Sequence, residues 1–223
     1  MAALIKAAGP YNLHPVECVS PFKHLAEAII SQQISGRAAK AILRRFIGLF
    51  NDGVDFPTPR AVIAIKDRLV RGAGLSAAKA AAIRDLASKI VEGVVPDTPT
   101  LAILDDCEIL EQLTTVRGIG PWTVQMMLIF QLGRPDVLPT IDYGVRNGFR
   151  IAYRLRNLPT PGELARYGER WTPFRSAAAW YLWRAVDLEK VGVEWQRPKI
   201  RIWRTSYRAG ASAHRRRSGE RTR

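Results

Sequence analysis

The sequence predicts an all-α fold in which two helical lobes flank a cleft. Apolar residues recur three and four positions apart along most of the 223 residues, which is the periodicity of amphipathic helices. No segment alternates as a half-buried strand would, and no repeat is evident. Hydrophobic residues make up 47% of the chain, enough for a core. Their comparable share in the first and last thirds favours two lobes.

The helices expected in the first half begin at residues that cap helices well. Residues 20–33 open with Ser20 as N-cap and Pro21 at the first helical position. Residues 57–65 read as a loop that leads into a short helix. Residues 35–50 predict a helix with Ser35 as its N-cap. Residues 74–93 predict a helix with Ser76 as its N-cap and a stop at Gly93.

The second half continues the helical pattern. Residues 100–116 predict one or two short helices, and residues 121–132 are apolar almost all round, which predicts a buried helix. Residues 143–155 and 172–190 predict two more. Only residues 134–141 look extended, and they form a short segment.

Composition excludes several classes of protein. Cys18 and Cys107 cannot supply a four-cysteine metal or iron–sulfur site, and so few thiols suit a reducing compartment. The three histidines lack metal-ligand spacing, so no metal site is expected. No apolar run of about 18 residues and no signal-peptide pattern is present. We therefore expect a cytoplasmic monomer with no membrane partner, and no protein partner is inferred.

The charge distribution indicates a polyanionic partner. The net charge is +14. Residues 197–223 carry ten Lys/Arg and one Glu, a net +9, which leaves +5 for the rest of the chain. Nucleic acid is the simplest partner for such a chain. Residues 209–223 are expected to be a basic, disordered tail, and a merely solubilising role for it is the alternative.

The stretch "LTTVRGIGPWTVQ" predicts a tight hairpin between two helices. The first helix should end near Thr115 and the next begin at Pro121, whose φ suits a first helical residue. Gly118 and Gly120 allow positive φ and leave room for an approaching backbone. The free amides of such a turn form a phosphate site. From the glycine spacing alone, an ordinary helix–helix turn remains the alternative.

Five segments in order resemble a known family. "LTTVRGIGPWTVQMM" followed by "DVLPTIDYGVRNGF" resembles the helix–hairpin–helix DNA glycosylase superfamily. "AIISQQISGRAAKAI", "GAGLSAAKAAAIRDLA" and "WTPFRSAAAWYLWR" resemble its 3-methyladenine DNA glycosylase II branch. The resemblance runs from about Pro21 to Leu188. It implies one glycosylase domain over residues 1–208, made of two helical subdomains, with the chain termini and the first helix packed against the C-terminal helices.

The resemblance implies a base-excision repair enzyme that removes alkylated purines from damaged double-stranded DNA. Endonuclease III-like members carry four clustered cysteines near the C-terminus, and this chain has none there. Bifunctional members place a lysine nucleophile where this chain has Trp122, and an indole cannot form a Schiff base. A monofunctional enzyme is therefore expected. A uracil or hypoxanthine glycosylase and a non-catalytic DNA-binding module are the alternatives.

The family motif places the catalytic carboxylate at Asp142, where it would stabilise an oxocarbenium-like sugar and orient water. From the residues alone, Asp142 could simply cap the helix that starts at Tyr143. Many members have a second acid where this chain has Ile141. A base must leave the duplex before this chemistry, and Gln33, beside Gln32 and Ile34, is the candidate wedge. The candidate pocket residues are Trp122, Tyr143 and Phe22, whereas Trp180 and Trp183 are expected in the core.

The candidate DNA contacts of the hairpin are Arg117, Gly118, Ile119 and Gly120. The side chains expected to contact phosphates are Arg117, Arg146, Lys40 and Lys79. No cofactor is expected, except that the family's hairpin can hold a monovalent cation on backbone carbonyls. Here those would be the carbonyls of Thr115, Val116 (or Arg117) and Ile119.

Overall fold

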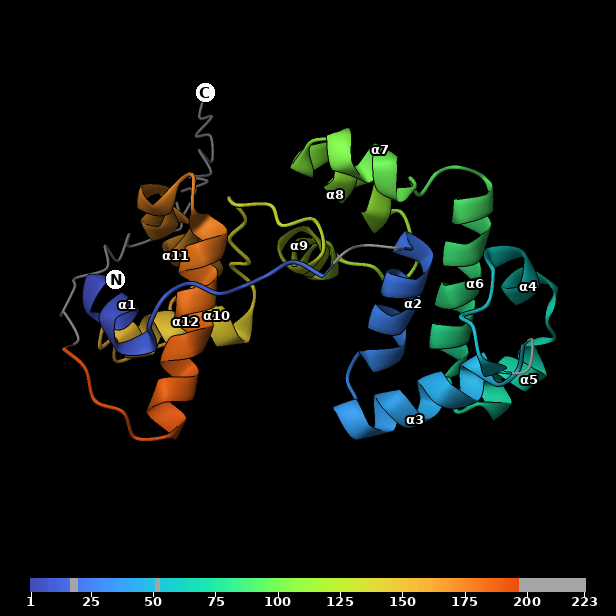
Figure 1. Cartoon of the computed structure of the whole chain (residues 1–223), viewed down its shortest axis with the longest axis horizontal. Helices are drawn as coiled ribbons and strands as arrows, with labels where there is room; N and C mark the ends of the chain where they lie inside the picture. The colour runs from blue at the N-terminus through green and yellow to red at the C-terminus, as the bar shows by residue number, and fades with distance from the viewer. Residues whose placement is uncertain (17–19, 51–52, 197–223) are drawn as a thin grey trace, which may run out of the picture.

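The computed structural model describes residues 1–16, 20–50 and 53–196, and these contain helices and no strand. Two groups of helices lie on either side of α9 (Pro121–Phe130), which is seen end-on in Figure 1. The all-α prediction is confirmed. The first group consists of α2 (Pro21–Ser31), α3 (Gly36–Ile47), α4 (Pro59–Ala64), α5 (Asp67–Gly72), α6 (Ala77–Val91), α7 (Thr98–Ile103) and α8 (Asp106–Thr114). The second consists of α1 (Ala2–Ala8), α10 (Tyr143–Ala152), α11 (Pro161–Gly168), the 3₁₀ turn η2 (Glu169–Trp171) and α12 (Arg175–Lys190).

The helix starts follow the predicted caps. The hydroxyls of Ser20, Ser35 and Ser76 each accept a hydrogen bond from the backbone amide three residues further on. Such a bond satisfies one of the amides that a helix N-terminus leaves unpaired. Residues 100–116 form two short helices, α7 and α8, and α9 begins at Pro121 as predicted.

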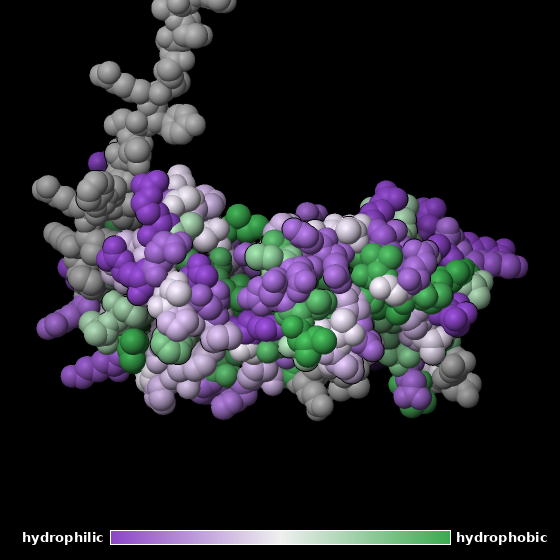
Figure 2. All heavy atoms as spheres, turned by 90° about the horizontal axis from the view of Figure 1, so that it is seen from above, coloured by the Kyte–Doolittle hydropathy of each residue, from purple (hydrophilic) through white to green (hydrophobic). Residues whose placement is uncertain are grey.

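Each group of helices has its own hydrophobic core. The first core includes Leu25, Ile83 and Leu113 and extends onto α9, and the second includes Phe149 and Leu182. Trp183 packs against both cores and so lies where the two groups meet. On the face shown in Figure 2, polar side chains predominate and the hydrophobic patches between them are small.

Helices α10 and α12 cross at very short range. A Cβ atom built on Gly148 would lie 1.9 Å from the carbonyl oxygen of Leu182, so the crossing requires glycine there. One turn earlier, a Cβ atom on Gly144 would lie 2.9 Å from Cδ1 of Trp183. These two glycines let α12 bring Trp183 against the first turn of α10.

Some elements were not anticipated. Helices α5 and α11 fall where no helix was predicted. Residues 134–141 form turns and irregular backbone, with no strand. The expected basic tail at residues 209–223 lies outside the described residues, so its predicted disorder stays a prediction.

Candidate active site

Asp142 lies at the centre of the site, where it caps α10 and accepts three hydrogen bonds. Its Oδ1 accepts from the backbone amide of Val145 at 2.7 Å and from the indole Nε1 of Trp183 at 2.9 Å. Its Oδ2 accepts from the indole Nε1 of Trp122 at 2.9 Å. The capping role and the catalytic role are therefore compatible, because the donors that hold the carboxylate leave Asp142 partly exposed.

Trp183 corrects the sequence-based interpretation. It was expected to be a core residue, and it does stack on Phe130 with ring centroids 5.5 Å apart. Its indole N–H nevertheless reaches Asp142, 41 positions away in sequence. The helical spacing of Trp180 and Trp183 carried no sign of this contact, which depends on the close crossing at Gly144 and Gly148.

A pocket of about 770 Å³ opens beside Trp122. One wall is the face of α2 formed by residues 24, 27, 28 and 31, which are three or four positions apart. The first part of α9 also lines the pocket, with Trp122 and Met126, and so does α3, with Lys40. Trp122 thus lines the pocket with its ring and holds Asp142 with its N–H. Among the predicted site residues, Gln32 and Gln33 also line it.

Two of the predicted pocket residues are placed elsewhere. Phe22 is 3% exposed and packs edge-on against Phe56 in the core, so its predicted place beside the flipped base is corrected. Tyr143 is 67% exposed and does not line this pocket. Apolar character alone could not separate Trp122, which is 42% exposed, from the buried Phe22.

The hairpin presents unpaired amides. Gly118 has φ +80°, a left-handed conformation that favours glycine. The backbone amides of Gly118, Gly120 and Trp122 make no hydrogen bond within the described residues. They can therefore bind a phosphate at the start of α9. Gly120 has φ −106°, so only Gly118 uses the positive φ that both glycines allow, and a Cβ on Gly120 would meet no atom within 4 Å.

The candidate wedge lies in a strained turn. Gln33 has φ +58°, which is uncommon for a residue other than glycine. Its side chain and that of Ile34 are exposed at the end of α2. Gln32 donates from Nε2 to the carbonyl oxygen of Gly118 at 2.9 Å. The structure thus brings the predicted wedge and the predicted hairpin into direct contact.

The predicted phosphate contacts divide into two groups. Arg117 and Lys40 have exposed side chains, as a phosphate contact requires. Arg146 and Lys79 instead bind backbone carbonyls of the protein, Arg146 through Nε on Pro159 and Lys79 through Nζ on Ile30 and Gln32. Their predicted role as phosphate contacts stays a prediction. Ile119 has a buried side chain, so only its backbone can take part.

Three pKa shifts fall near the site. Burial lowers the pKa of His24, which lines the pocket, and the pKa of Lys79. Burial would raise the pKa of Asp85, but hydrogen bonds from the Arg117 amide and from Lys89 outweigh it and lower that pKa. Asp85 therefore stays a carboxylate that holds the hairpin backbone, with Oδ2 2.7 Å from the Arg117 nitrogen.

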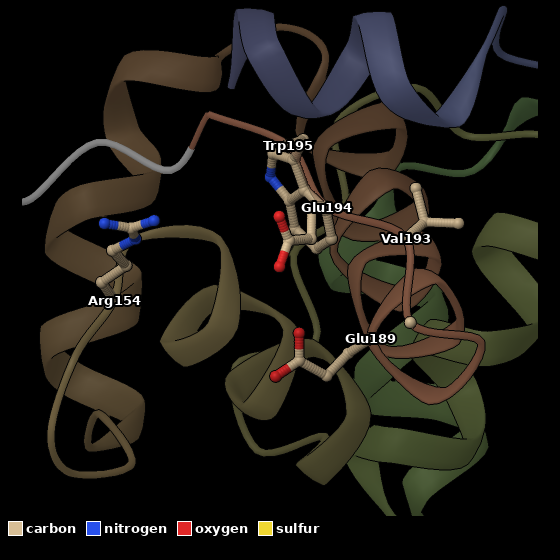
Figure 3. Close-up of a pocket in the computed structure, with 6 residues that line it drawn as sticks. Arg154, Glu189, Val193, Glu194 and Trp195 are labelled. Carbon is tan, nitrogen blue, oxygen red and sulfur yellow. The ribbon is translucent and has the colours of Figure 1, made fainter.

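A second hollow of about 350 Å³ lies at the end of α12, and Asp142 does not line it. Figure 3 shows the carboxylates of Glu189 and Glu194 directed into it, with Arg154 across from them. None of the residues that the sequence marked as candidates lines this hollow.

The structure offers little for a metal ion. Within residues 1–16, 20–50 and 53–196, no group of three His, Cys, Asp or Glu side chains could hold one. The carbonyl of Thr115, one of the carbonyls expected to bind a monovalent cation, accepts a hydrogen bond from Lys89. The monovalent cation at the hairpin stays a prediction. Over the same described residues, every helix is too short or too polar to cross a membrane.

A glycine hairpin, a helix-capping aspartate and a pocket lined by the tryptophan that binds this aspartate together define a helix–hairpin–helix base-excision protein. The chain belongs to the HhH-GPD superfamily of base excision DNA repair proteins, whose family model matches residues 26–174.

Its relatives within the superfamily include 3-methyladenine DNA glycosylases. The chain is 39% identical to DNA-3-methyladenine glycosylase 1 of Schizosaccharomyces pombe, over 83% of this chain and 81% of that protein. The solved structure of the S. pombe 3-methyladenine DNA glycosylase in complex with abasic DNA superposes with a TM-score of 0.73, covering 81% of this chain and 88% of that one. The DNA-3-methyladenine glycosidase of Bacillus halodurans gives a TM-score of 0.76 at 31% identity, covering 84% of each chain.

Proposed function

We propose that this protein hydrolyses the N-glycosidic bond of alkylated purines, such as 3-methyladenine, in double-stranded DNA. The observation that carries the proposal is Asp142, held by two indole N–H groups, one of them from Trp122, which lines the adjacent pocket. The names of the relatives point to the same substrates.

The reaction follows from the position of that carboxylate. As the C1′–N bond breaks, its electron pair leaves with the base and positive charge develops on the sugar. The negative charge of Asp142 stabilises that cation, and the carboxylate accepts a proton from the water whose oxygen bonds to C1′. The ring of Trp122 offers an electron-rich face to a cationic base. A cationic purine is already a good leaving group, so no strong general acid is needed.

The same geometry supports a monofunctional reaction. A bifunctional enzyme needs an amine that attacks C1′. Here the corresponding position holds Trp122, and its N–H is engaged by Asp142. The expected product is therefore an abasic site in an intact strand.

A base-release assay tests the proposal. The full chain is incubated with duplexes that carry 3-methyladenine, hypoxanthine or uracil, and free base and strand cleavage are measured separately. We expect 3-methyladenine release, with strand cleavage only after alkali. Release of uracil alone would replace the proposed substrate, and a borohydride-trapped complex would contradict the monofunctional reaction. Binding without release of any base would leave a DNA-binding module.

A further inference from the structure

One face of α6 contacts both turns that are expected to touch DNA. These are the turn after α2 at residues 32–34, called the wedge turn, and the hairpin at residues 116–120. Lys79, Ala82, Asp85 and Lys89 are spaced three, three and four residues apart, so they lie in a row along the helix. Lys79 reaches the wedge turn after α2, and the other three reach the hairpin before α9. The two turns are 86 residues apart, as measured between Gln32 and Gly118.

At the wedge end, the ammonium group of Lys79 binds the C-terminal end of α2. Its Nζ donates to the carbonyl oxygen of Ile30 at 2.8 Å and to that of Gln32 at 2.7 Å. The last carbonyls of a helix have no partner within the helix and carry partial negative charge, so a cation binds them well. The residue that follows Gln32 is Gln33, whose positive φ must be maintained by its surroundings.

At the hairpin end, α6 binds the backbone of the first half of the turn, at Thr115 and Arg117. Asp85 accepts from the Arg117 amide at 2.7 Å and from Lys89 Nζ at 3.0 Å, and Lys89 also donates to the carbonyl oxygen of Thr115. A Cβ on Gly118 would lie 3.3 Å from the Cβ of Ala82, so the turn rests directly on the helix.

We propose that Lys79 is a positioning residue for base flipping: it fixes the wedge turn at a set distance from the hairpin. The Gln32 bond to Gly118 joins the two turns directly, and Lys79 holds the carbonyl side of that same residue. The wedge can then enter the duplex while the hairpin amides hold the phosphate. Lys79 acts through Gln33 and touches neither the base nor the sugar. This inference rests on the proposed function.

The chain offers a matched control on the same helix. Arg84 lies on α6 and also donates to two backbone carbonyls, those of Ile63 in the last turn of α4 and of Ile65 directly after it, and it pairs in addition with Asp67. Lys79→Met and Arg84→Met therefore each remove a cation from a pair of carbonyls. Only the first of these pairs belongs to a DNA-contacting turn.

The test measures single-turnover base release from two duplexes, one with the lesion fully paired and one with the lesion in a mismatch that already weakens pairing. We expect Lys79→Met to slow release from the paired lesion about 10-fold or more, because small displacements of a positioned group cost that much. The loss should be smaller on the mismatched lesion, and Arg84→Met should affect both alike and weakly. Equal losses from the two variants on both duplexes would overturn the inference. An inactive wild-type protein would instead overturn the proposed function.

Two further measurements separate positioning from other roles. If Lys79 acts through the wedge, adding Lys79→Met to Gln33→Ala should cost almost nothing more, whereas independent roles would add. Lys79→Arg keeps the charge and donors, so it should retain most of the paired-lesion rate even if Lys79→Met folds poorly. The salt dependence of binding should stay unchanged in both variants. A slope smaller by about 0.9 would make Lys79 a phosphate contact and overturn the positioning role.

Discussion

At the residue scale, three hydrogen-bond donors surround one carboxylate. The three donors to Asp142 come from α9, α10 and α12. Both carboxylate oxygens of Asp142 therefore act as hydrogen-bond acceptors. A substitution that removes the charge of Asp142 and a substitution that removes one of its donors should therefore have separable effects on base release.

Asp142→Asn should abolish most activity and lower stability moderately. Asn can still cap α10, but its amide nitrogen would face the N–H of Trp122 or Trp183 and leave a donor unpaired. We expect a rate loss on the order of 10²–10³ and a loss of about 1–3 kcal/mol in the free energy of unfolding. Single-turnover release and urea unfolding measure the two effects. Wild-type rates in a folded variant would leave Asp142 as a helix cap only.

Trp183→Phe tests the donor that the sequence did not reveal. Phenylalanine keeps an aromatic ring against Phe130 but loses the N–H that reaches Oδ1 of Asp142. A hydrogen bond to a charged group contributes about 1.5–3 kcal/mol, so base release should slow by roughly 10-fold to 100-fold. Trp180→Phe is the control, since no hydrogen bond from the Trp180 indole to Asp142 is present. A control that slowed release as much would show that the effect is packing.

At the element scale, glycines allow two helices to cross closely and leave open space beside the hairpin. The crossing of α10 and α12 depends on Gly148, and the turn before α9 keeps open space beside Gly120. We expect the close crossing at Gly148 to affect folding and the open space at Gly120 to affect DNA binding. One substitution at each place can show the difference.

Gly148→Ala should destabilise the fold. Its Cβ would lie 1.9 Å from the Leu182 carbonyl oxygen, so α10 and α12 would have to separate. Overpacking of this kind costs typically 1–3 kcal/mol, and a clash with rigid backbone belongs at the upper end or above it. Gly162→Ala in α11 is the matched control, because its Cβ would meet nothing within 4 Å. Thermal unfolding should show a lower Tm for the first variant only. Equal Tm values would mean that the crossing relaxes easily.

Gly120→Val should fold and bind DNA poorly. No atom lies within 4 Å of the Cβ position, and φ is negative, so the fold accepts a side chain there. A branched side chain would nevertheless cover the amides that are expected to bind phosphate. Titration of an abasic-site duplex, with the Tm as a check of folding, measures the effect. Unchanged affinity would remove the hairpin from the DNA interface.

The sequence predicted the local parts of this fold better than its contacts. Serine caps, the hairpin and the start of α9 were all visible, because each depends on residues within one turn of helix. Helix α11 was missed although Thr160 and Glu163 form a capping box, a pattern that could have revealed it. Trp183 and Lys79 could not have been assigned, because their partners lie 41 and 47 to 49 residues away and depend on how helices cross.

At the scale of the whole molecule, net charge and the hairpin predict how binding responds to salt. The affinity for duplex DNA should fall linearly with salt on logarithmic axes, with a slope of about −0.9 for each neutralised phosphate. Arg117→Ala should reduce that slope by about one contact, because Arg117 is exposed beside the hairpin amides. Lys66→Ala, which removes an exposed charge between α4 and α5, is the control and should leave the slope unchanged. The same slope for Arg117→Ala and wild type would place Arg117 outside the interface.

The two faces of α2 also bear on how easily this enzyme could be altered. Its inward face fills the core, and its outward face lines the pocket beside Trp122. Selection for a new lesion could therefore diversify the outward positions without disturbing the packing that keeps the protein folded. A library of variants confined to those positions would retain a high fraction of folded members. The outward positions are His24, Glu27, Ala28 and Ser31.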